Sequence, residues 1–199
     1  LIPGELGGSL VRSFALAGAT LIGLALFSSA VFKWFPRLAV HWRLRRYMGV
    51  SGFIFGAIHV LTVLHYLFDY NISAIYYSFN PIENPMIFTS IAFPILFVMA
   101  ITSTDWAVTK LTPKVWKFIH RFVYLAYWGV VFHFLLINPA LLKNPPGYFL
   151  LAITALALFG ELFWFIKIAS KKRFLSVGSA VGFAIIFLFL GTGYFAYKE

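Results

Sequence analysis

The 199-residue sequence contains no cysteine, and only six of its residues are acidic. The absence of cysteine excludes disulfide bonds, iron–sulfur clusters, thiolate zinc sites and the Cys-x-x-Cys-His attachment of c-type haem. Charged residues of both signs make up 11% of the chain, whereas a soluble domain has about 25%. What the sequence lacks therefore argues against a soluble or disulfide-stabilised protein.

Most residues of the chain are apolar. They make up 61% of the chain, aromatic residues alone 20%, and the mean hydropathy is +0.88. A bilayer core takes about 20 apolar residues as a helix. The sequence predicts an all-α, polytopic membrane bundle, a single domain over 1–199 with six transmembrane helices. These six runs are at 10–32, 46–68, 86–104, 117–137, 147–168 and 174–196.

Turn and helix-start signals separate these runs. Asn80-Pro81, Asn84-Pro85 and Asn144-Pro145-Pro146-Gly147 are typical of turns. Thr112 followed by Pro113 predicts an N-cap with proline at the first helical position, where no backbone N–H is needed. Pro94 inside the third run is expected to kink that helix.

Basic residues predict the orientation in the membrane. Thirteen of the sixteen lie in or beside alternate connections: Lys33, Arg37, Arg43, Arg45, Arg46, Lys110, Lys114, Lys117, Arg121, Lys167, Lys171, Lys172 and Arg173. The positive-inside rule places these connections (33–46, 105–117 and 167–173) on the cytoplasmic side. We expect the protein to lie in the cell inner membrane. We therefore attribute the net charge of +10 to an interaction with the membrane surface rather than with nucleic acid. The chain starts with leucine and shows no cleavable signal peptide, so we expect a trimmed or partial N-terminus.

Three histidines lie within the apolar runs. They are His59 in the second run and His120 and His133 in the fourth. Ionisable side chains inside a membrane span are costly and mark functional sites. Without cysteine, they point to non-covalent haem held between helices 2 and 4, and hence to an electron carrier. At 1.5 Å per residue, His59 and His133 are expected at comparable height, roughly 20–24 Å from the inner face.

His120 lies one turn inside the cytoplasmic end of the fourth run. On an ideal helix it would point roughly 140° away from His133. Either the helix is locally rewound, or the two histidines serve different partners. His65 and His41 are interpreted as interfacial and solvated side chains, and Glu161 as a carboxylate near the inner interface.

Small residues and an arginine share one face of the second run. Arg45, Gly49, Gly52, Gly56 and His59 follow at spacings of four and three residues. Glycines on this face would let a planar macrocycle lie against the backbone. The alternative is a small-residue stripe for close packing of two membrane helices.

Three stretches carry a resemblance to a known family: "RRYMGVSGFIFGAIH" at 45–59, "ITSTDW" at 101–106 and "WKFIHRFVYLAYWGVVFH" at 116–133. The chain resembles the ferric reductase-like transmembrane domain superfamily, and within it the MsrQ (YedZ) group of haem-binding membrane subunits. The resemblance is strongest over 10–137, and 174–196 is an additional C-terminal helix.

The resemblance implies that His59 and His133 are axial ligands of a b-type haem, and that His120 is the inner histidine. Arg45 and Arg46 occupy the level where four-histidine relatives place another ligand. Either a second, weakly held haem or FMN is then expected near the cytoplasmic side.

The implied function is that of an electron-transfer component rather than a complete enzyme. A cytoplasmic flavin reductase or a quinol would donate electrons. A periplasmic molybdopterin methionine sulfoxide reductase would accept them. Two alternatives stay open: a ferric or metal reductase component, and a non-redox small transporter or assembly factor.

Overall fold

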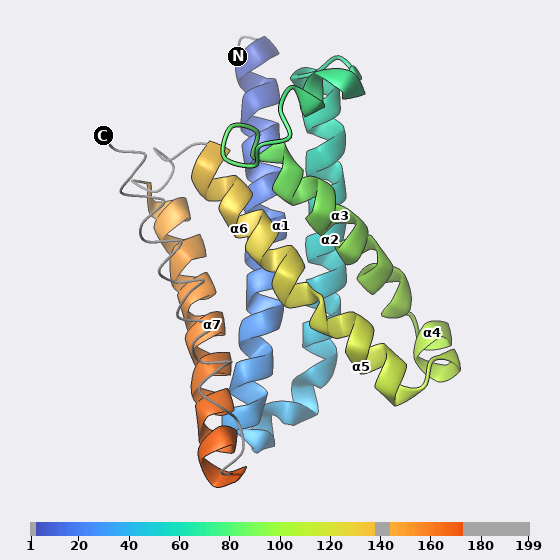
Figure 1. Ribbon diagram of the computed structural model, residues 1–199, viewed down its shortest axis with the longest axis vertical. Coiled ribbons are helices and arrows are strands. Elements are labelled where there is room, and N and C mark those ends of the chain that lie inside the picture. The colour runs from blue at the N-terminus through green and yellow to red at the C-terminus, as the bar shows by residue number, and fades with distance from the viewer. Residues whose placement is uncertain (1–2, 138–143, 173–199) are drawn as a thin grey trace. The chain divides into compact units, whose positions relative to one another are not determined.

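A computed structural model describes residues 3–137 and 144–172, and in this part of the chain all regular structure is helical (Figure 1). The elements are α1 (Pro3–Trp34), η1 (Pro36–His41), α2 (Trp42–Tyr66), η2 (Ile72–Tyr76), α3 (Met86–Thr102), α4 (Asp105–Lys110), α5 (Pro113–Arg121), α6 (Val123–Ile137) and α7 (Pro145–Lys172). Internal contacts divide the chain into two compact units, Leu1–Gly160 and Glu161–Glu199. The candidate sites described below belong to the first unit.

Five of the six apolar runs appear as helices, and the sixth, at 174–196, lies outside the described residues. Four helical stretches are long and apolar enough to cross a membrane: Leu6–Trp34, Pro36–Tyr66, Pro113–Ile137 and Pro145–Trp164. The third run is shorter than expected, since α3 has 17 residues and a length of about 25 Å. It ends at Thr102 because Ser103 and Thr104 turn the chain into the short α4.

Glycines allow α1 and α2 to pack in close contact (Figure 1). A Cβ atom at Gly52 would lie 3.1 Å from the carbonyl oxygen of Gly18 and 2.7 Å from the Cγ1 atom of Ile22. A Cβ atom at Gly18 would in turn lie 3.0 Å from the backbone nitrogen of Gly56. The helix-packing interpretation of the small-residue stripe therefore holds for Gly52.

A second close contact joins α3 to α6. A Cβ atom at Gly129 would lie 2.9 Å from the carbonyl oxygen of Phe88 and 3.3 Å from Ala92. The rings of Phe88 and Phe132 stack beside this contact, with centroids 5.3 Å apart. The two helices run in opposite directions, so residues after Gly129 meet residues before Phe88 (Figure 1).

A buried hydrogen bond joins α6 to the first part of α7. The hydroxyl of Thr154 donates to the carbonyl of Leu150 at 2.8 Å. The hydroxyl of Tyr127 therefore donates to the oxygen of Thr154, at 2.9 Å. Around Tyr127 lies the buried apolar core, which also includes Ile22, Leu26, Val123, Val131 and Ala157.

The fourth run is two helices rather than one. α5 ends at Arg121 and α6 begins at Val123, with Phe122 in a turn between them. At this turn the backbone N–H of Phe122 donates to Ile119, three residues earlier, instead of four. The interruption lies between His120 and His133, so the two histidines belong to different helices.

The helix-start signals are also confirmed. The side chain of Thr112 accepts a hydrogen bond from the backbone N–H of Val115, and Pro113 takes the first helical position. Thr104 caps α4 in the same way by accepting from Ala107. Pro94 lies inside α3, and the helix continues past it.

The predicted orientation can be tested with single cysteines, because no native cysteine has to be removed. We expect Lys114→Cys to react with a membrane-impermeant maleimide only after the cells are permeabilised. Ser73→Cys, in the exposed segment before α3, is expected to react in intact cells. The reverse pattern of labelling would contradict the assignment from the positive-inside rule.

The close contact between α3 and α6 predicts how a substitution at Gly129 changes the stability of the protein. Alanine is favoured over glycine in a helix by up to about 1 kcal/mol, yet Gly129→Ala would force a methyl group against a backbone oxygen. Overpacking of this kind costs about 1–3 kcal/mol. We therefore expect Gly129→Ala to lower the thermal unfolding midpoint in detergent. Gly8→Ala is the matched control, since its nearest neighbour would lie at an ordinary 3.7 Å, and an equal loss there would refute the packing argument.

Candidate functional site

Two of the three membrane histidines lie next to each other. The imidazole rings of His59 on α2 and His133 on α6 have centroids 6.5 Å apart and planes inclined by 66°. Both side chains are half-buried. The comparable height expected from the helical rise is confirmed for this pair.

Each of these histidines is held by a backbone carbonyl of another helix. The Nδ1 atom of His59 lies 3.0 Å from the carbonyl oxygen of Val11 on α1. The Nδ1 atom of His133 lies 3.2 Å from the carbonyl oxygen of Pro85, which caps α3. A carbonyl oxygen only accepts hydrogen bonds, so Nδ1 carries the proton in both rings. Both Nε2 atoms are therefore left with a lone pair that can bind a metal.

The close helix contacts put these carbonyls within reach. Gly129 lets α6 approach Phe88, and His133 is one turn further along α6. Pro85 lies about one turn before Phe88, at the start of α3, so its carbonyl lies beside the ring of His133. In the same way, the Gly18–Gly52 contact draws α1 against α2 and brings Val11 to His59.

A cavity of about 510 Å³ opens beside the two histidines. Its polar and apolar walls come from α1, α2, α6 and the start of α7: Val11, Arg12, Ser13, Ala15, Leu16, His59, His133, Phe134, Ile137, Asn144, Pro145, Pro146 and Gly147. Ligand-binding clefts in proteins usually have volumes of about 300–1,000 Å³. The size and mainly apolar lining are therefore suitable for a flat, largely apolar ligand.

The geometry of the pair fits a haem iron. A metal–imidazole bond is about 2 Å long, and a ring nitrogen lies roughly 1 Å from the centre of its ring. Two axial imidazoles on one iron thus have ring centres about 6 Å apart, close to the 6.5 Å between His59 and His133. In the described residues no three histidine or acidic side chains gather into a metal site. A haem requires only two, because its porphyrin supplies the other ligands.

A second cavity of about 430 Å³ lies at the other end of α2. It contains the predicted inner-level residues Arg45, Arg46, Gly49 and His120. The remaining lining is mostly apolar and aromatic: Ile22, Ala25, Leu26, Phe32, Trp42, Val50, Phe53, Leu96, Met99, Ala100, Ser103, Asp105, Val108, Trp116 and Val123. The structure therefore separates His120 from the histidine pair and gives it a cavity of its own.

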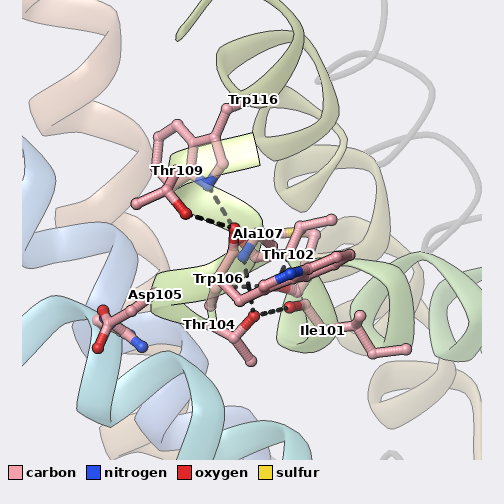
Figure 2. Close-up of polar contacts among 11 residues, drawn as sticks. Ile101, Thr102, Thr104, Asp105, Trp106, Ala107, Thr109 and Trp116 are labelled. Carbon is pink, nitrogen blue, oxygen red and sulfur yellow. Dashed lines mark hydrogen bonds and ion pairs between the residues drawn. The ribbon is translucent and has the colours of Figure 1, made fainter. Parts of the chain in front are cut away.

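His120 is held differently from the other two histidines. Its ring stacks on Trp116, with centroids 3.9 Å apart, and its Nε2 atom lies 3.2 Å from the hydroxyl of Thr102. The same hydroxyl also lies 2.8 Å from the carbonyl oxygen of Val98. The indole N–H of Trp116 donates to the carbonyl of Thr102, as Figure 2 shows. At this level Nε2, rather than Nδ1, takes part in the hydrogen bond.

Arg46 forms an ion pair with Asp105 at the start of α4. The hydrogen bond and the positive charge of Arg46 lower the pKa of the Asp105 carboxyl from its ordinary value. This carboxylate is 91% exposed, so the pair contributes little to stability. Sequence reasoning missed Asp105 because 59 positions separate it from Arg46. Within the described residues, Arg45 forms neither an ion pair nor a hydrogen bond, and it lines the same cavity.

The three glycines of α2 have different surroundings. Gly52 is packed against α1 and lines neither cavity. Gly49 lines the inner cavity, and a Cβ atom there would meet only Ala25, at 4.0 Å. A Cβ atom at Gly56 would meet nothing within 4 Å. Open space beside the α2 backbone is therefore present at Gly49 and Gly56, not at Gly52.

The histidines interpreted as structural lie apart from both cavities. His65 packs its ring against Tyr66 and Tyr70 at the end of α2. His41 is exposed at the end of η1. Neither residue lines a cavity described above.

Comparison with known proteins identifies the family. Residues 14–131 match the family described as "Ferric reductase like transmembrane component". This chain belongs to that family. The match includes His59, His120 and both cavity-lining arginines of α2, and it ends two residues before His133. It supports a multi-pass membrane protein.

Several relatives carry the name protein-methionine-sulfoxide reductase haem-binding subunit MsrQ. The chain is 34% identical to the one from Azospira oryzae over 112 residues, covering 54% of this chain and 47% of the relative. It is 31% identical to the one from Caulobacter vibrioides over 145 residues, covering 68% and 66%. The chain thus spans between about half and two thirds of the length of these relatives. No solved structure matches it.

Proposed function

We propose that this protein is a membrane-embedded electron-transfer subunit that holds one b-type haem between α2 and α6. His59 and His133 are its axial ligands, each through Nε2. The observation that carries the proposal is the adjacent pair of imidazoles, whose ring centroids are 6.5 Å apart and whose Nδ1 atoms both donate to carbonyl oxygens.

Ligation by two histidines decides what such a site can do. When bound, the haem supplies an iron that changes reversibly between its ferric and ferrous states. His59 and His133 would both bind the iron and would leave it no site for oxygen or a substrate. The carbonyls of Val11 and Pro85 keep both rings in one orientation and raise the basicity of each Nε2. A site of this kind carries electrons and does not activate a substrate.

The names of the relatives support an assignment of direction and partners. The Azospira and Caulobacter relatives are named as haem-binding subunits of a methionine sulfoxide reductase. We propose a periplasmic molybdopterin reductase of this type as the acceptor, with a cytoplasmic flavin reductase or a quinol as the donor. The protein would then lie in the inner membrane, with the histidine pair nearer the outer face.

The inner cavity is proposed as the entry point for electrons. Arg45 offers a planar guanidinium that suits a phosphate or a carboxylate. His120 and Trp116 add a flat aromatic wall next to it. An FMN phosphate or the propionate of a second haem matches this combination of charge and shape. Of the two, FMN requires no iron ligand from His120, whose Nε2 already binds Thr102.

Replacing the facing histidines tests the haem site. His59→Ala and His133→Ala are each expected to abolish the low-spin spectrum of the purified protein, because each opens one axial position. The measurement is a reduced-minus-oxidised visible spectrum, with haem content determined on the same sample. His65→Ala and His41→Ala are matched controls and should keep the wild-type spectrum. A wild-type protein without any haem spectrum would instead favour a non-redox membrane protein.

Replacing the inner arginines tests the entry point. We expect Arg45→Gln together with Arg46→Gln to slow haem reduction by the cytoplasmic donor roughly tenfold or more, while the haem stays bound. Chemically pre-reduced protein should pass electrons outward at the wild-type rate. Stopped-flow spectroscopy measures both steps, and Asp105→Asn shows what loss of the ion pair alone does. An unchanged entry rate in the double variant would leave these arginines as topology signals only.

A further inference from the structure

Asn84 is the most completely buried polar side chain of the segment between α2 and α3. Its exposed fraction is 0%. The side-chain amide donates to the carbonyl of Ile75 at 2.7 Å and to the carbonyl of Ser78 at 3.0 Å. Its Oδ1 atom accepts from the backbone N–H of Met86 at 3.2 Å. One side chain thus joins the end of η2 to the start of α3.

The residue that follows Asn84 holds a proposed haem ligand. The carbonyl of Pro85 accepts from Nδ1 of His133 at 3.2 Å and also from the backbone N–H of Phe88 at 3.2 Å. Proline fixes its own φ angle. The direction in which its carbonyl points therefore depends on the conformation of the backbone next to it. The hydrogen bonds of Asn84, immediately before Pro85, fix that part of the backbone.

We propose that Asn84 is a positioning residue that sets the electronic character of the His133 imidazole through the carbonyl of Pro85. This inference rests on the proposed function, because it takes His133 as an iron ligand. Asn84 does not touch the ring itself. It holds the backbone so that the Pro85 oxygen stays in line with Nδ1.

The direction of the effect follows from the hydrogen bond. An imidazole that donates from Nδ1 to a carbonyl becomes a stronger electron donor to its metal. A stronger donor stabilises ferric iron more than ferrous iron, which lowers the reduction potential. Loss of alignment between Pro85 and His133 should therefore raise the potential.

The experiment compares three variants of the purified protein in detergent or nanodiscs. Asn84→Ala removes all three hydrogen bonds. Asn84→Asp keeps an acceptor for Met86 but loses both donors. Asn71→Ala is the matched control, because Asn71 caps η2 from an exposed position and its side chain accepts hydrogen bonds from Ala74 and Ser73. The readouts are the midpoint potential from a redox titration and the low-spin g values from electron paramagnetic resonance.

We expect both Asn84 variants to keep haem but to shift its potential upward and to change the g values. At the wild-type midpoint, the ratio of reduced to oxidised haem should rise by up to about tenfold, and a tenfold rise corresponds to about 59 mV for one electron. Asn71→Ala should leave both readouts unchanged.

Three results would overturn the proposal. One is a wild-type potential and spectrum in Asn84→Asp, which also decides the question if Asn84→Ala does not fold. Another is an equal shift in Asn71→Ala, since that would assign the effect to the whole segment. The third is a wild-type protein without bis-histidine haem, which is seen before any variant is made and refutes the proposed function as well.

Discussion

The hydrogen bonds from His59 and His133 to carbonyls of neighbouring helices are the interaction on which the arrangement of this protein depends. Each bond joins two helices: α2 to α1 through Val11, and α6 to α3 through Pro85. In a bilayer, a polar ring with no partner costs several kcal/mol, because no water replaces the missing bond. The backbone carbonyls must therefore come within about 3 Å of each ring nitrogen. That requirement sets how closely the helices have to pack.

Glycine meets the requirement in both helix pairs. Gly52 and Gly18 let α2 lie against α1, and Gly129 lets α6 lie against the carbonyl of Phe88. In each pair the histidine follows about one or two turns after the glycine contact. The two explanations of the glycine stripe are thus linked, since close packing at Gly52 also positions His59. At Gly56 only the Cβ side of the backbone stays open, while its nitrogen faces Gly18 of α1.

Much of the site could be predicted from the sequence, because it follows from helical rise. The rise of 1.5 Å per residue is enough to bring His59 and His133 to one height, and capping rules locate the start of α5 at Thr112. The break at Phe122 was left open by the sequence, since no proline or glycine marks it. The carbonyl partners could not be predicted either, because any residue type offers a carbonyl. The ion pair of Arg46 with Asp105 forms because the chain turns after α3. The spacing of apolar residues in the sequence does not predict that turn.

The two histidine levels differ in which ring nitrogen takes part in a hydrogen bond, and this difference follows from the elements that surround them. At the outer level, carbonyls at helix contacts accept the Nδ1 proton and leave Nε2 with its lone pair. At the inner level, Nε2 of His120 is hydrogen-bonded to the hydroxyl of Thr102, and Trp116 covers one face of the His120 ring. To bind a metal through Nε2, His120 would have to break that bond and leave the tryptophan. The outer histidines would have to break nothing. The outer pair is thus preorganised for iron, whereas the inner cavity offers a cationic and aromatic surface that suits an anionic, planar group.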